Sequence, residues 1–168
     1  MLKRHLAALA AVASMTALTV AGGLNGCRSE ANALENVDPA QAKWSTYANA
    51  QLQYALEYPT ILSPQDYGDG SALFRYHSGV PVLVRYTTEE EGRNRGVWFG
   101  HEPVAKIRLG GRDGEKFIYD HGDGPFVTRT IAYVVEYRDR YLGLEFRTDG
   151  ELSPVQQRIL DSFRFTSR

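Results

Sequence analysis

Two consecutive segments with an apolar residue at every second position constrain the fold of this chain more than any other feature. They span residues 127–137 and 141–147, and Arg138-Asp139-Arg140 between them is suited to a turn. A period of two places alternate side chains on opposite faces of a strand. One face of this pair is expected to be apolar throughout, made by Ile131, Tyr133, Val135, Tyr137, Leu142, Leu144 and Phe146. The pattern predicts an antiparallel hairpin with one buried face.

Shorter segments of the same kind precede this hairpin. Strands are predicted over residues 52–58, 72–76, 80–86, 104–109 and 115–120. His77-Ser78-Gly79 is a candidate tight turn, and the glycine-rich run 110–114 separates the last two strands. Pro59 ends the first strand, because proline lacks the N–H that a sheet needs. We expect these strands to form one antiparallel sheet of about six to eight strands.

A helix is expected near the C-terminal end. In Ser153-Pro154-Val155-Gln156, the serine is a candidate N-cap, the proline suits the first helical position and the glutamine completes a capping box. Apolar residues then recur at helical spacing, at Leu152, Val155 and Ile159. Such a stripe can pack on a sheet.

The remaining segments indicate little further helix. A second helix over residues 88–97 is one alternative, but Gly92 and Gly96 each disfavour a helix by about 1 kcal/mol relative to alanine, so we interpret the segment as a loop with about one helical turn. A last short strand is expected over residues 163–165. The expected fold class is therefore α+β, an antiparallel sheet packed by the C-terminal helix with room for one or two others.

A secretory leader is indicated at the start of the chain. Basic residues at positions 3–5 precede an apolar run over residues 6–20, and small residues lead into Leu24-Asn25-Gly26-Cys27. This order is typical of a signal peptide. The last four residues resemble the bacterial lipobox. The resemblance implies that residues 1–26 are removed and that Cys27 carries a diacylglyceryl group and fatty acyl groups.

Two alternatives remain open for the leader: a transmembrane anchor, and an ordinary cleaved signal with an incidental cysteine. A spanning helix needs about 20 apolar residues, whereas this run of roughly 15 gives way to Gly22, Gly23 and Asn25. The chain's single cysteine stands where a lipobox requires one. We expect an exported lipoprotein anchored by its lipid. Arg28, in place of the aspartate that usually retains lipoproteins at an inner membrane, favours the outer membrane facing the periplasm. In a host with one membrane, the outer face of the cell membrane is expected.

Residues 27–43 are predicted to form the lipidated N-terminus and a flexible tether, because the segment is polar, poor in aromatic residues and interrupted by Pro39. A short helix over residues 39–43 is the alternative. Residues 44–168 form the expected single domain. Without the leader, 17 basic residues stand against 20 acidic ones, a net charge of −3. This balance argues against nucleic acid as a partner. Lipidation of Cys27 leaves no thiol for a disulfide or a zinc site, and no further cofactor is expected.

The two ends of the predicted domain resemble a known family. Trp44-Ser45-Thr46-Tyr47 runs into Leu52-Gln53-Tyr54-Ala55-Leu56-Glu57-Tyr58-Pro59, and the far end reads Arg158-Ile159-Leu160-Asp161-Ser162-Phe163-Arg164-Phe165. Together they look like the Mog1/PsbP-like domains of many small bacterial lipoproteins. The resemblance implies an antiparallel sheet of six or seven strands sandwiched by helices. It implies no shared catalytic residues, because one member is an extrinsic photosystem subunit and another binds a small GTPase.

Asp120, His121 and Asp123 form one candidate chemical site. Two carboxylates and an imidazole within four residues can ligate a divalent cation or serve in acid–base chemistry. The alternative is an ordinary turn, because Asp, Gly and the following Pro125 are common turn residues. The sequence has no G-x-S-x-G, H-E-x-x-H, P-loop or Rossmann motif that would point to a known chemistry.

Arg93, Arg95, Trp98 and His101 form a second candidate, a recognition loop over residues 92–101. Arginines beside aromatic residues, with glycines for mobility, can bind an acidic or aromatic group of a partner. The alternative is a solvated charged turn whose Trp98 and Phe99 pack onto the core.

Two functions from different classes follow. The first is a lipid-anchored, non-catalytic binding or assembly module of the cell envelope, using residues 92–101 and the open face of the sheet to bind an envelope protein or a small ligand. The second is an envelope enzyme or metal binder built on Asp120, His121 and Asp123. An exposed apolar groove would favour a third function, carriage of a small hydrophobic ligand.

Overall fold

The computed structural model describes residues 33–121 and 128–166. Cys27 and the predicted ligand Asp123 lie outside these residues. The described strands are β1 (Trp44–Asn49), β2 (Tyr54–Pro59), β3 (Ser63–Asp66), β4 (Ala72–Tyr76), β5 (Gly79–Thr87), β6 (Ala105–Leu109), β7 (Arg112–His121), β8 (Thr128–Tyr137), β9 (Arg140–Thr148) and β10 (Arg164–Phe165). The described helices are α1 (Glu89–Asn94) and α2 (Pro154–Ser162).

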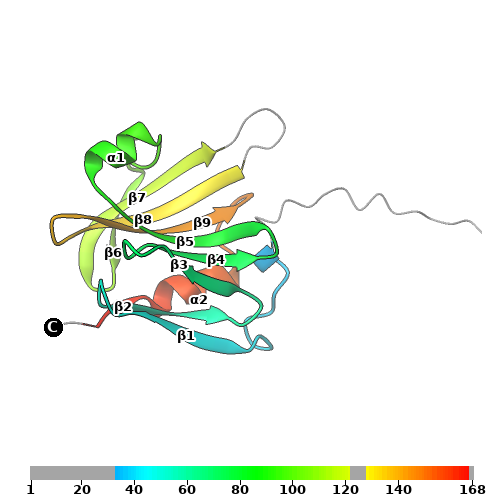
Figure 1. Ribbon diagram of the computed structural model, residues 1–168. Helices are drawn as coiled ribbons and strands as arrows, with labels where there is room; N and C mark the ends of the chain where they lie inside the picture. The colour runs from blue at the N-terminus through cyan, green and yellow to red at the C-terminus, as the bar shows by residue number, and fades with distance from the viewer. Residues whose placement is uncertain (1–32, 122–127, 167–168) are drawn as a thin grey trace, which may run out of the picture.

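The strands form two antiparallel sheets (Figure 1). The large sheet has seven strands in the order β3-β4-β5-β9-β8-β7-β6, and the small sheet has the order β1-β2-β10. The predicted antiparallel α+β fold is confirmed, as is the expected number of strands in the main sheet. The small sheet is an addition, because we expected all strands to join one sheet. It depends on β10 pairing with Tyr54 and Ala55 at the start of β2, far earlier in the chain.

The predicted hairpins supply most of the large sheet. In β8–β9, Ile131 faces Phe146 and Tyr133 faces Leu144, so the predicted apolar side chains share one face. The β6–β7 turn is Gly110-Gly111, with φ of 57° and 87° at the two residues. Two residues in the left-handed region make a turn whose twist matches that of the strands. Register through these turns fixes which side chains reach each face of the sheet.

One hydrophobic core joins the inner face of the large sheet, the small sheet and α2. Val155 and Ile159 of α2 are fully buried and belong to the same cluster as Leu144 and Phe146 of β9. The predicted capping box is present: Gln156 N–H donates to the Ser153 hydroxyl, and Ser153 N–H donates to the Gln156 side-chain oxygen at 2.9 Å. The predicted helix is confirmed, with the expected stripe turned toward the sheet.

Helix α1 lies where we expected a loop with about one helical turn. Thr88 and Glu91 form a capping box at its start. The Thr88 backbone N–H, which donates to the Glu91 carboxylate at 3.0 Å, lowers the pKa of that carboxyl. Gly92 gives room to a neighbour, because a Cβ at this position would lie 2.9 Å from Cδ2 of Phe99. Local capping thus offsets the low helix propensity of glycine.

The described part of the expected tether, residues 33–43, lies against the domain. Leu34 is fully buried in the main core. Pro39 accepts a hydrogen bond from Trp44 Nε1 at 3.1 Å, and Arg158 of α2 lies over the Trp44 ring at 4.0 Å. Residues 39–42 form turns rather than the alternative helix. The packed domain therefore begins about ten residues before the predicted boundary at residue 44. Neither described helix is long and apolar enough to span a bilayer.

Candidate ligand-binding groove

The outer face of the large sheet, which faces away from the main core, carries a second and smaller cluster of buried residues. It consists of Val97, Trp98, Phe117, Tyr119, Ala132 and Val134, with Phe99 and Tyr141 packed against it. Phe117 of β7 and Val134 of β8 lie on this face because they alternate along their strands with residues that point into the main core. The loop that follows α1 supplies Val97, Trp98 and Phe99, so the loop covers the middle of the outer face.

Trp98 holds the loop on the sheet. Its side chain is fully buried, and a Cβ on Gly143 of β9 would lie 2.6 Å from Cη2 of Trp98. The backbone of Trp98 is in the left-handed region, with φ of 44°. Its buried Nε1 has no hydrogen-bond partner among the described residues. Left-handed backbone and an unpaired buried N–H both cost free energy, so close packing of the ring must offset them.

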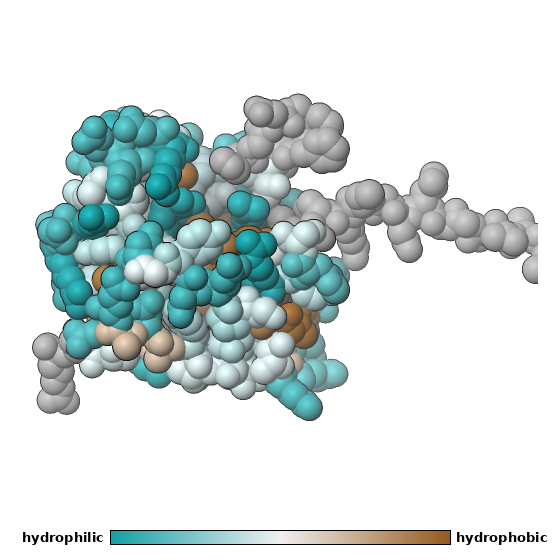
Figure 2. Space-filling view, viewed as in Figure 1, coloured by the Kyte–Doolittle hydropathy of each residue, from teal (hydrophilic) through white to brown (hydrophobic). Residues whose placement is uncertain are grey.

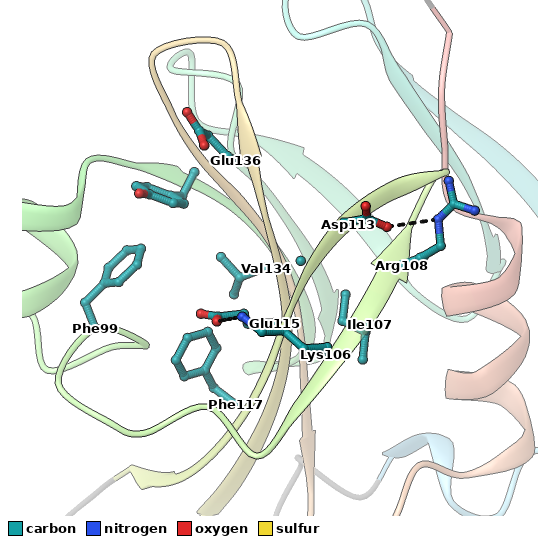
Figure 3. A pocket seen from close by; sticks show the side chains of 11 residues that line it. Phe99, Lys106, Ile107, Arg108, Asp113, Glu115, Phe117, Val134 and Glu136 are labelled. Carbon is teal, nitrogen blue, oxygen red and sulfur yellow. Dashed lines mark hydrogen bonds and ion pairs between the residues drawn. The ribbon is translucent and has the colours of Figure 1, made fainter.

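Beside this loop lies a hollow of about 800 Å³, here called the outer groove. Figure 3 shows Phe99 of the loop after α1, Phe117 of β7, and Val134 and Glu136 of β8 around it. Tyr141 also lines it, and so do the charged residues Lys106, Arg108, Asp113 and Glu115 of the β6–β7 hairpin. A volume of this size falls in the range of about 300–1,000 Å³ that is usual for small-molecule sites.

Three aromatic rings from three elements converge in the outer groove. Phe99 belongs to the loop after α1, Phe117 to β7 and Tyr141 to β9. The ring centroids of Phe99 and Tyr141 lie 4.6 Å apart at an interplanar angle of 65°, and those of Phe99 and Phe117 lie 6.4 Å apart at 66°. These edge-to-face arrangements are favourable for aromatic pairs. Phe117 is buried, whereas Phe99 and Tyr141 remain half-exposed.

The charges around the outer groove are mostly paired. Lys106 bonds Glu115, its direct partner across the hairpin, and Arg108 Nε lies 3.2 Å from Asp113 Oδ1. Glu136 of β8 is exposed and has no ion-pair partner among the described residues. It is the strand partner of Tyr141, so its side chain shares the outer face with that ring. The ionisable lining residues therefore carry one net negative charge.

A buried polar cluster lies elsewhere on the same face. Arg85 Nε donates to Glu145 Oε1 at 2.6 Å, and Tyr119 OH donates to Glu145 Oε2 at 3.4 Å. Burial alone would lower the pKa of Arg85, but the hydrogen bond to Glu145 and its charge outweigh burial and raise it. Burial also raises the pKa of Tyr119. Arg85 and Arg95 line a smaller hollow of about 210 Å³, together with Ser71. Arg85 and Tyr119 are therefore both bonded to the carboxylate of Glu145, which fixes the positions of these side chains.

The four residues of the predicted recognition loop have different environments. Arg93 is exposed and bonds both Glu89, at 2.6 Å, and the Phe99 carbonyl, at 2.9 Å. Arg95 is exposed at the end of α1, and the ring of His101 stacks on Tyr119 with centroids 4.8 Å apart. Trp98 is buried and offers no surface to a partner in this conformation, as the alternative interpretation expects. Figure 2 shows hydrophilic side chains over α1. A binding role for this loop stays a prediction.

The predicted metal site is not brought together within the described residues. Asp120 Oδ1 lies 3.4 Å from Arg129 Nε on the neighbouring strand. Asp123 and the side chain of His121 are outside what the structure describes. Among the described residues, no three His, Cys, Asp or Glu side chains are placed to hold a metal ion. Metal binding at Asp120, His121 and Asp123 therefore stays a prediction.

Sequence reasoning missed the residues of the outer groove. Glu115 and Phe117 alternate with the inner residues of β7, so the pattern did contain their common face. Glu136 and Tyr141 are strand partners across the predicted turn, which also follows from register. The position of Phe99 could not be predicted, because nothing in the local sequence indicates where the loop after α1 lies on the sheet.

The fold and the groove define an antiparallel α+β domain with a ligand-sized hollow on the outer face of its main sheet. No family model and no curated protein matches the sequence. Two solved structures are similar to it. One is a protein from Bacteroides thetaiotaomicron VPI-5482, with a TM-score of 0.49 and 11% identity over 76% of this chain and 50% of that one. This chain thus spans about half the length of that protein.

The other is the cyanobacterial PsbP (CyanoP) of Synechocystis sp. PCC 6803, with a TM-score of 0.47 and 14% identity over 79% of this chain and 99% of that one. It is a PsbP, the kind of domain that the sequence resembles. Neither likeness assigns the chain to a family or to an activity.

Proposed function

We propose that the protein is an exported lipoprotein, anchored through Cys27, that acts as a non-catalytic binding module of the cell envelope. The observation that carries the binding role is the outer groove. It is open, of ligand size, and lined by three aromatic rings with mostly paired charges around them. A hollow with apolar walls and a few polar groups is the usual form of a small-molecule site.

The position of the groove supports this role. In Figure 1 the chain enters the domain at the right, near the end of β4, whereas α1 and β6 lie at the left. The groove is lined by Phe99, just after α1, and by Lys106 and Arg108 of β6, so it lies toward the left end. An anchored domain would then hold the groove away from the point where its chain leaves toward the membrane.

The anchor would be short. Leu34 is fixed in the core, and seven peptide links join it to Cys27. A fully extended chain covers at most about 3.3–3.6 Å per residue, so the lipid would lie within about 25 Å of Leu34. The domain would remain close to the bilayer, which suits a protein that acts on envelope components.

Replacing Cys27 by serine tests the anchor. We expect Cys27→Ser to move the protein from the membrane fraction to the soluble fraction and to abolish metabolic labelling with a palmitate analogue. One acyl chain anchors only marginally, so loss of all of them should release the protein. Urea unfolding of the variant should match that of the wild type, because the packed domain begins after this residue. Continued membrane association together with palmitate labelling would contradict the proposal.

A further inference from the structure

Two half-exposed aromatic rings, Phe99 and Tyr141, line the outer groove together with the buried ring of Phe117. The ring of Phe99 is inclined by 65° to that of Tyr141 and by 66° to that of Phe117, so the faces of Phe99 and Tyr141 point in different directions. The face of an aromatic ring carries partial negative charge and attracts a cation placed within about 6 Å of its centre. Several rings around one space can therefore hold a single cationic group more strongly than one ring can.

The charges of the groove favour the same kind of ligand. Lys106 and Arg108 are each neutralised by a carboxylate on the facing strand. Glu136 is left without an ion-pair partner among the described residues, and Figure 3 shows its carboxylate at one side of the hollow, on the same sheet face as Phe117 and Val134. An anion would meet this uncompensated charge, whereas a monovalent cation would balance it.

We propose that the outer groove binds a small organic cation with an apolar body, of the quaternary ammonium class. This inference rests on the proposed binding function and names its ligand. A quaternary ammonium group has no N–H to leave unpaired against apolar walls, and aromatic rings are its usual protein partners. Glu136 supplies the counter-charge, and the half-exposed rings of Phe99 and Tyr141 supply the surfaces that contact the methyl groups. The hollow of about 800 Å³ leaves room for the rest of the ligand.

Titration with choline tests the proposal, using the full-length protein in a non-ionic maltoside detergent. The neutral isostere 3,3-dimethylbutan-1-ol, which has carbon in place of the charged nitrogen, serves as the comparison ligand. Choline is expected to shift the backbone amide signals of Phe99, Phe117 and Tyr141 in NMR spectra. The neutral isostere is expected to bind about tenfold more weakly, because it lacks the cation–ring and carboxylate attractions.

Two variants of groove residues and one control variant separate the effect of charge from that of packing. Glu136→Gln should weaken choline binding by about threefold to tenfold and leave binding of the neutral isostere unchanged, since the side chain is exposed and keeps its shape. Glu151→Gln removes an exposed carboxylate outside the groove and should change neither. Tyr141→Leu should weaken choline binding by about fivefold or more. The Glu136 comparison does not depend on the folding of the Tyr141 variant.

The outcomes also distinguish this inference from the proposed function. Equal binding of choline and its neutral isostere would show an apolar groove with no preference for charge and would overturn the inference. Absence of any shift at the groove residues would overturn it as well. In either case, release of the Cys27→Ser protein from the membrane would leave the proposed anchoring in place, because that readout does not involve the groove.

Discussion

At the scale of single residues, Trp98 and Gly143 determine how the outer face is covered. The indole of Trp98 fills the space that a side chain at Gly143 would occupy. Its left-handed backbone and its unpaired Nε1 are unfavourable by themselves. Burial of a large aromatic side chain contributes enough to offset such costs. Phe99 is the next residue in the chain, so the packing of Trp98 on the sheet also positions one wall of the outer groove.

Replacement of Gly143 by alanine should displace this ring. The added methyl group would lie 2.6 Å from Cη2 of Trp98, and an overfilled site typically costs about 1–3 kcal/mol. We expect the free energy of unfolding to fall by that amount in urea, and the tryptophan emission to shift as Trp98 meets water. Gly150→Ala is the matched control, because a Cβ there meets nothing within 4 Å. A Gly143→Ala protein as stable as the control would show that the loop moves aside without cost.

At the scale of helices and strands, the elements that were predicted are those whose signals are local. Helix α2 follows from Ser153, Pro154 and Gln156, which stand within four residues of one another. The hairpins follow from alternation and from short turns. Helix α1 was not the favoured interpretation because Gly92 within it and Gly96 just after it disfavour a helix, whereas its stability comes from the Thr88–Glu91 capping box and from packing of Phe99 on Gly92. The small sheet was missed because β10 pairs with a strand far away in sequence.

The cap of α2 can be tested at this scale. Ser153→Ala removes the acceptor of the Gln156 N–H, and loss of a serine N-cap typically costs about 1 kcal/mol. We expect the free energy of unfolding, measured in urea, to fall by about that amount. Ser153→Thr keeps the hydroxyl acceptor and should restore most of the stability. Equal loss in both variants would mean that burial of the serine, rather than the cap, carries the effect.

At the scale of the whole molecule, the features that could not be predicted from the sequence depend on packing between residues far apart in the chain. Residues 33–43 are polar enough to suggest a tether. Leu34 is nevertheless buried in the core, and the Pro39 carbonyl accepts a hydrogen bond from Trp44 Nε1. Leu34 and Val37, which also packs against the core, are too few to define a period, so their burial depends on the rest of the fold. The outer groove is similar, because its walls come from the loop after α1, from β6–β7 and from β8–β9. The register of each hairpin was predictable, but the position of the loop over them was not.

Two buried tyrosines make the free energy of unfolding depend on pH. Tyr54 in the main core donates to the Gly70 carbonyl at 3.1 Å, and Tyr119 on the outer face donates to Glu145. Burial raises the pKa of both phenols above the ordinary value of 10.0. The folded protein therefore keeps these phenols neutral at a pH where the unfolded chain loses their protons. Above pH 10 the unfolded state binds fewer protons, so the free energy of unfolding should fall as pH rises.

The slope of that fall identifies the groups responsible. Each phenol that ionises in the unfolded state alone lowers the free energy of unfolding by about 1.4 kcal/mol for each pH unit above pH 10, and below pH 10 its stabilisation is fully present. Urea unfolding between about pH 8 and pH 11 should give a smaller slope for Tyr119→Phe than for the wild type, by about that amount. Tyr67→Phe, at a site that is 56% exposed, is the control and should leave the slope unchanged. If Tyr119→Phe lowers stability equally at every pH, then its lost hydrogen bond to Glu145 matters and its ionisation does not.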